Sequence, residues 1–101
     1  WRLATYNNDI TGLVNASCGV FLYDMDNIDD GSAFEIGFMR ALHKPVILVP
    51  FTNDPNKEKE MNLMLAQGVT TIIDGNTDFE KLATYDFNTT PANPVVGYKI
   101  I

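Results

Sequence analysis

The chain has 101 residues, of which 46% are hydrophobic and 20% are charged, and this balance is typical of one folded domain rather than a disordered segment. The formal net charge of −6 makes nucleic acid and anionic membranes poor partners, and it favours a neutral or weakly cationic small molecule. The longest apolar run, "PVILVPF", is too short to cross a bilayer.

One cysteine and one histidine restrict the possible redox and metal chemistry. Cys18 is the single cysteine of the sequence and has no partner for a disulfide within it. Because His43 is the single histidine, a Cys/His zinc site is excluded as well. We assign neither residue a chemical role. This cysteine usage favours a reducing compartment, so we expect a cytoplasmic protein.

The first half of the chain predicts two helices and two strands. In residues 1–17, "WRLATYNNDITGLVNAS", the spacing of three or four residues between apolar side chains predicts an amphipathic helix. Residues 18–24, "CGVFLYD", predict a buried strand of a parallel sheet. Residues 32–42, "SAFEIGFMRAL", predict a helix that ends at His43 and Lys44, since cations complement the helix dipole and Pro45 stops the helix. Residues 46–51, "VILVPF", predict the next strand.

The second half continues the alternation of helices and strands. We expect a helix at residues 59–68, "KEMNLMLAQG", closed by Gly68, and a strand at residues 69–74, "VTTIID". A last helix is predicted at residues 77–85, "TDFEKLATY", and the rest from Phe87 is predicted to be an irregular tail.

This order of elements predicts an α/β fold, with a parallel sheet covered by helices on both faces. Three strands make a small sheet, and the chain opens on a helix. We therefore expect residues 1–101 to form a single α/β catalytic domain that lacks its first strand–helix unit. Ligands of such folds bind beyond the carboxyl ends of the strands. The start of the "SAFEIGF" helix, which carries Glu35, is expected to lie there.

Glu35 lies among apolar residues and allows two interpretations. Ser32 and Glu35 have the spacing of a capping box, in which the glutamate serves only to start a helix. Alternatively, a sheltered ionised carboxylate can act as a nucleophile. Aspartates crowd the preceding loop and are expected to raise the pKa of Glu35, while the helix N-terminus acts in the opposite direction; they are Asp24, Asp26, Asp29 and Asp30.

These aspartates do not fit a calcium-binding EF-hand loop. If Gly31 takes the place of the loop glycine, Ile28 and Gly37 fall on positions that require oxygen ligands. Magnesium held by two or three of the aspartates remains an alternative. Two further polar clusters are "YNND" at residues 6–9 and Asn62 within "MNLM".

Taken together, these segments give the sequence a specific resemblance. It resembles the nucleoside 2-deoxyribosyltransferases of the type found in lactobacilli, and it does so through "ATYNNDITGL", "GVFLYDMDNIDDGSAFEIGFMRAL", "KPVILVPF" and "MNLMLAQGV". The resemblance implies a flavodoxin-like fold, a homo-hexamer with sites shared between subunits, and transfer of 2-deoxyribose between nucleobases without a metal or cofactor. Nucleosides and free bases would be the substrates, with purines favoured.

The resemblance also implies roles for individual residues. Glu35 would attack C1′ of the sugar, and Asp9 or Asp29 would deliver a proton to the departing base. Asn62 would reach the sugar hydroxyls from a neighbouring subunit, and Met64 would orient the region of the nucleophile. Tyr6 and Phe34 are the remaining substrate-binding candidates, and Phe34 and Phe38 would help to exclude water.

The chain departs from the family pattern at both ends, and three other functions compete. Family members have an earlier strand–helix unit that carries aromatic residues against the base, and they close a neighbour's site with their C-terminus, where this chain ends "GYKII". The alternatives are an N-glycoside hydrolase of deoxynucleosides or deoxynucleotides, a non-catalytic nucleoside-binding module, and a magnesium-dependent phospho-acceptor.

Overall fold

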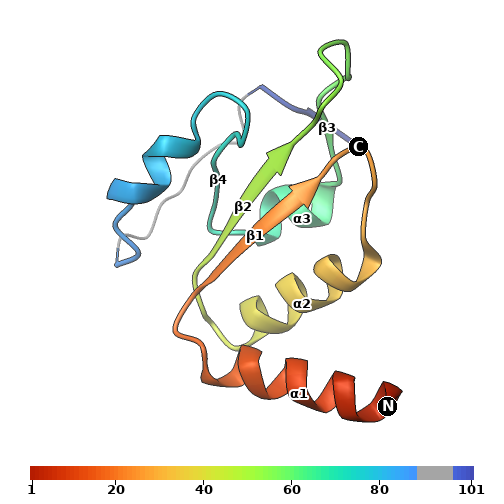
Figure 1. The fold of residues 1–101 in the computed structure, drawn as a ribbon. Helices are drawn as coiled ribbons and strands as arrows, with labels where there is room; N and C mark the ends of the chain where they lie inside the picture. Colours follow the sequence, from red (N-terminus) through yellow and green to blue (C-terminus); the bar gives the residue numbers. More distant parts are fainter. Residues whose placement is uncertain (89–96) are drawn as a thin grey trace.

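The fold was analysed in a computed structural model, which describes residues 1–88 and 97–101 (Figure 1). Its elements in chain order are α1 (Arg2–Asn15), β1 (Gly19–Asp24), α2 (Asp30–Ala41), β2 (Val46–Phe51), β3 (Glu60–Met61), α3 (Leu63–Gly68), β4 (Thr71–Ile72), the 3₁₀ helix η1 (Phe79–Thr84) and β5 (Lys99–Ile100). Within the described ranges, no helix combines the length and the apolar character needed to cross a membrane.

The main sheet is parallel, with the strand order β1-β2-β4. β1 and β2 pair along their whole length, from Gly19 opposite Val46 to Asp24 opposite Phe51. β2 lies in the middle and is buried on both faces, which explains its continuous apolar run. The predicted parallel α/β fold is therefore confirmed.

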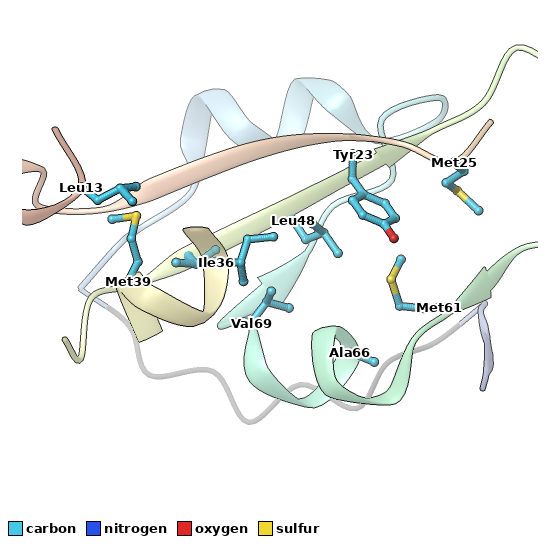
Figure 2. Close-up of a cluster of buried hydrophobic side chains, with 10 residues drawn as sticks. Leu13, Tyr23, Met25, Ile36, Met39, Leu48, Met61, Ala66 and Val69 are labelled. Atoms are coloured by element: carbon cyan, nitrogen blue, oxygen red, sulfur yellow. The ribbon is translucent and has the colours of Figure 1, made fainter. Parts of the chain in front are cut away.

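Helices α1, α2 and α3 cover one face of this sheet. Their buried residues join those of β1 and β2 in one cluster, in which Ile36 and Met39 of α2 lie against Leu48 of β2. Figure 2 shows this cluster extending from Leu13 of α1 to Met61 of β3. The start and the path of α2, which carries Glu35, are thus fixed by a packed core.

The opposite face is only partly covered, and here one prediction was wrong. Ile47 and Val49 of β2 pack with Ile73, and the segment that contains η1 covers them. On β1 the same face is open, since Val20 is 42% exposed and Leu22 is 62% exposed. The expectation that β1 is buried on both faces fails because the short 3₁₀ helix reaches only β2 and β4.

A second sheet of two strands lies where a helix and an irregular tail were predicted, so both predictions were partly wrong. Glu60 and Met61 pair in parallel with Lys99 and Ile100 as β3 and β5. The helix expected at residues 59–68 therefore begins only at Leu63, and the tail expected to be irregular from Phe87 contains a strand. Residues 89–96 of that expected tail lie outside the described residues. Met61 is almost completely buried in the main hydrophobic cluster, and this packing together with the pairing favours the strand at residues whose local sequence also suits a helix.

Candidate active site

Glu35 lies in a groove between α1 and α2, which are neighbours on the same side of the sheet (Figure 1). The cavity has a volume of about 320 Å³ and is lined by Tyr6, Asp9, Ile10, Leu13, Gly31, Phe34 and Glu35. Four predicted site residues thus meet there, namely Glu35, Asp9, Tyr6 and Phe34. The ring centroids of Tyr6 and Phe34 are 6.3 Å apart, and those of Phe34 and Phe38 are 6.4 Å apart.

The start of α2 excludes the capping-box interpretation of Glu35. The N-cap is Asp29, whose Oδ1 accepts a hydrogen bond from the Gly31 backbone N–H at 2.9 Å. The Ser32 hydroxyl donates to Asp29 Oδ2 at 3.3 Å, so Ser32 lies inside the first turn and does not cap it. An aspartate is an equally good N-cap, and with Asp29 in this role Glu35 falls a full turn too late to reach back to the cap.

The surroundings of Glu35 raise its pKa. Burial is the main cause, and the nearby carboxylates of Asp9 and Asp29 add to it. The sequence left the net direction open, since the loop aspartates were expected to raise the pKa of Glu35 and the helix N-terminus to lower it. The contribution of Asp9 from α1 was not foreseen. In residues 1–88 and 97–101, no hydrogen bond or ion pair neutralises the Glu35 carboxylate.

Two of the loop aspartates instead hold loops together. Asp24 Oδ1 accepts a hydrogen bond from the Asp26 backbone N–H at 3.0 Å. Asp26 accepts from the Thr52 hydroxyl at 2.6 Å and from the Asn53 backbone N–H at 2.8 Å, and these bonds lower its pKa. No group of three or more His, Cys, Asp or Glu side chains suited to a metal ion occurs in the part of the chain that the structure describes.

Asn62 and Met64 do not join the Glu35 groove within one copy of the chain. They line a second cavity of about 610 Å³ on the α3 side of α2, together with Ile101. Asn62 caps α3, since its Oδ1 accepts from the backbone N–H of Met64 at 2.8 Å and of Leu65 at 3.4 Å. The Met64 side chain is 77% exposed.

A polar cluster fixes the C-terminal strand beside this second cavity. Asp74 Oδ2 accepts from Lys59 Nζ at 2.8 Å and from the Tyr98 hydroxyl at 3.0 Å, and its Oδ1 accepts from the backbone N–H groups of Asn76 and Thr77. Burial raises the pKa of Asp74, but these four bonds outweigh it and hold the pKa at about 2. Burial also raises the pKa of Tyr98, with the neighbouring Asp74 charge adding to it.

Sequence reasoning missed two cations that join the helices. Lys44 Nζ donates to the backbone carbonyls of Leu13 and Val14 at the end of α1. Arg40 donates from Nε to the Gly68 carbonyl at 2.7 Å and from Nη1 to the Lys44 carbonyl at 2.9 Å. Lys44, which follows the end of α2, was interpreted only as a cation that complements the dipole of that helix, and nothing in the local pattern indicates that it binds α1.

The fold and the groove define a class: an α/β protein with a parallel sheet and a partly buried carboxylate in an aromatic-lined groove at the N-terminal half of a helix. The chain belongs to the nucleoside 2-deoxyribosyltransferase family, whose model matches residues 1–64.

Individual relatives agree with this family. The chain is 47% identical over 100 residues to a nucleoside deoxyribosyltransferase of Limosilactobacillus fermentum, covering 99% of this chain and 59% of that protein. It is 33% identical over 88 residues to the Lactobacillus leichmannii enzyme, covering 87% of this chain and 52% of that protein. The chain thus spans little more than half the length of these relatives.

A solved structure of a 2-deoxyribosyltransferase from Bacillus psychrosaccharolyticus superposes on the chain with a TM-score of 0.72 at 30% identity. The match covers 95% of this chain and 64% of that one. This similarity confirms the flavodoxin-like α/β architecture that the resemblance implied.

Proposed function

We propose that the protein transfers 2-deoxyribose from a nucleoside to a free base through a covalent glycosyl intermediate on Glu35. The observation that carries the proposal is the Glu35 carboxylate, which lies in this groove and has no ion pair or hydrogen bond among the described residues. Membership of the family supports the reaction class. A carboxylate that is not neutralised by the protein remains available to a carbon that develops positive charge.

The proposed reaction has two displacements at C1′ of the sugar. A Glu35 oxygen forms a bond to C1′ while the bond to the first base breaks, and that base leaves with a proton from a neighbouring acid. The second base then attacks C1′ and displaces Glu35, losing a proton to the same acid. Two inversions give retained configuration and ping-pong kinetics. None of these steps uses a metal or cofactor, and we expect full activity in excess EDTA.

We assign the proton transfer to Asp9 rather than to Asp29. Both oxygens of Asp29 already accept hydrogen bonds at the start of α2. Asp9 is exposed at the groove and has no hydrogen bond among the described residues. Asp9→Asn is therefore expected to lower turnover by about 10²-fold or more, the usual contribution of a general acid. In Asp29→Asn the cap is retained, and a smaller loss is expected.

Tyr6 and Phe34 are proposed to bind the substrate as the aromatic wall of the groove. Phe34 is 54% exposed and Tyr6 is 50% exposed, so both rings offer a free face to a base or a sugar. With substrate in place they would also keep water from the glycosyl intermediate.

We further propose that Asn62 and Met64 act on the groove of a neighbouring subunit in a homo-hexamer. Their distance from Glu35 along the surface, on the other side of α2, supports a role in a second copy rather than in their own. Leu63, Met64, Ile28 and Ile101 are exposed near that cavity and give this surface the apolar character of an interface. A cytoplasmic location and a preference for purines belong to the same proposal.

The test incubates the protein with deoxyinosine and adenine. Formation of deoxyadenosine is expected from the wild type, and its loss by at least about 10⁴-fold is expected from Glu35→Gln. A slow fluorinated deoxynucleoside analogue should add the mass of the sugar to the peptide that contains Glu35. Transfer that survives in Glu35→Gln, or an adduct on another side chain, would exclude this residue as the nucleophile. Replacing adenine by thymine tests the purine preference.

One observation favours hydrolysis as a second candidate. Phe34 lines the groove and is 54% exposed, so water can reach Glu35 whenever no base covers this ring. Release of free deoxyribose without deoxyadenosine in the same assay would support the hydrolase.

A further inference from the structure

Helix α1 brings Tyr6 and Asp9 to the groove, yet it has little buried surface to fix its position. Leu13 is its one buried residue, and Ile10 is partly buried against the same core. A helix held by so few apolar contacts is expected to move on its neighbour unless polar bonds restrain it.

Lys44 supplies such a restraint from the far end of α2. Its Nζ donates to the Leu13 carbonyl at 2.8 Å and to the Val14 carbonyl, two groups that have no partner inside α1 because the helix ends at Asn15. The position of Lys44 is itself fixed, since Arg40 binds its carbonyl at 2.9 Å and the Gly68 carbonyl at 2.7 Å.

We propose that Lys44 is a positioning residue, which fixes α1 across α2 and thereby sets how closely Asp9 and Tyr6 approach Glu35. Its catalytic consequence rests on the proposed function, but its structural effect does not. Lys44 itself does not line the groove and contacts none of the reacting groups.

The titration of Glu35 reports on this placement without any turnover. The ionisable groups that face it are Asp9 and Tyr6 from α1 and Asp29 from the start of α2. If α1 moves away, Glu35 loses both burial and the Asp9 charge, and its pKa falls toward the ordinary value. Removal of the positive charge of Lys44 alone would instead raise the pKa of Glu35. The direction of the pKa change therefore distinguishes a positioning role of Lys44 from a purely electrostatic one.

The experiment follows the Glu35 carboxyl carbon by NMR during a pH titration of the wild type, Lys44→Met and Lys81→Met. Lys81 of η1 forms an exposed ion pair with Asp78, the residue before this helix. The control variant Lys81→Met therefore changes the net charge by the same amount as Lys44→Met and leaves the contacts of α1 intact. We expect a lower Glu35 pKa in Lys44→Met only. Backbone amides of α1 should exchange about tenfold faster there, in line with the loss of charge-assisted hydrogen bonds.

A double variant makes the test specific. Asp9→Asn should lower the Glu35 pKa in the wild type and should have a smaller effect in Lys44→Met, where α1 is already displaced. If Lys44→Met does not fold, Lys44→Gln keeps one donor and should give a smaller shift in the same direction. An unchanged or raised Glu35 pKa with unchanged α1 exchange would overturn the proposal. If the pKa falls as expected while Glu35→Gln still transfers, the positioning role stands and the proposed reaction fails.

Discussion

At the scale of single residues, Glu35 is a side chain whose charge is unfavourable for folding. Burial and two nearby carboxylates raise its pKa, so the folded state binds its proton more tightly than the unfolded chain does. The resulting stabilisation is complete below the ordinary glutamate pKa and is lost as the pH rises through the raised value. At neutral pH the ionised group therefore destabilises the fold, a cost that the proposed role as a nucleophile would explain.

Glu35→Gln is accordingly expected to increase the free energy of unfolding at pH 7, by less than about 1 kcal/mol because the site is partly exposed. Near pH 3 the carboxyl group is protonated in both states, and the difference should vanish. Urea unfolding at the two pH values measures this effect. The exposed Glu80→Gln serves as the control and should change little at either pH. A clear loss of stability in Glu35→Gln would restore a purely structural role.

His43 is a second residue that is unfavourable for folding, here because of its backbone conformation. It has a φ of 59° at the end of α2, where its N–H donates to the Arg40 carbonyl and the Lys44 N–H donates to the Met39 carbonyl. This is a Schellman ending, which glycine fits without strain. His43→Gly should therefore stabilise the protein by about 1 kcal/mol. Thermal unfolding tests this expectation, with Leu42→Gly, at a φ of −85°, as a control that should destabilise.

At the scale of the elements, the cap of α3 allows the structural role of Asn62 to be tested apart from its proposed role in substrate binding. The side-chain oxygen of Asn62 caps the helix, so its amide N–H groups are free for the proposed substrate contact. Asn62→Ala should cost about 1 kcal/mol of stability, whereas Asn62→Asp should retain the cap. Both variants should lose transfer, by about tenfold or more if the amide binds a sugar hydroxyl. Normal transfer by Asn62→Asp would leave Asn62 with the cap alone.

Asp74 binds Lys59 and Tyr98, the residues that precede β3 and β5, and its contribution to stability should be sensitive to acid. Because the pKa of Asp74 is lowered to about 2 from 3.8, its contribution to stability is present above the ordinary value and is lost as the pH falls toward 2. Asp74→Asn should lose about 1–2 kcal/mol at pH 7. The gap to the wild type should close between about pH 4 and pH 2 in urea unfolding. Tyr98→Phe removes one donor of the four and should show a smaller loss.

Local pattern predicted some elements well and others poorly, for physical reasons. The strand "VILVPF" has one dominant signal and was found. The apolar stripe of α1 was predicted from Leu3, Tyr6, Ile10 and Leu13, and only Ile10 and Leu13 pack on the core, since Leu3 is 69% exposed and Tyr6 is 50% exposed. Glu60 and Met61 lie in a run that suits a helix, and they become a strand only because Lys99 and Ile100 pair with them from about forty residues away. That contact depends on the tertiary fold, which no local window contains.

The candidate site also combines features that local sequence indicates with features that depend on the tertiary fold. Glu35 could be singled out because a lone acid among apolar residues is unusual in a sequence. Its neighbour Asp9 was singled out only as part of "YNND", and its place opposite Glu35 follows from the packing of α1 on α2. The binding of α1 by Lys44 also joins residues about thirty positions apart, and it is visible only in the folded structure.

At the scale of the whole molecule, the three helices on one face are joined at their carbonyl ends. Lys44 binds the end of α1, and Arg40 binds the end of α3, both from the C-terminal end of α2. The two cavities lie on opposite sides of α2. This helix therefore separates the surface that carries Glu35 from the surface that carries Asn62, and a shared site requires a second copy to bring the two surfaces together.

The unpaired edge of β1 should make the 101-residue polypeptide prone to aggregation. The strand borders the sheet, no other described strand pairs with its free side, and Val20 and Leu22 face water beside it. An unpaired strand edge with exposed apolar side chains can pair with the same edge of another molecule and promote aggregation. Concentrated solutions of the polypeptide should therefore bind thioflavin over time. Measurements of particle size in such solutions will therefore detect this edge-to-edge association as well as any hexamer.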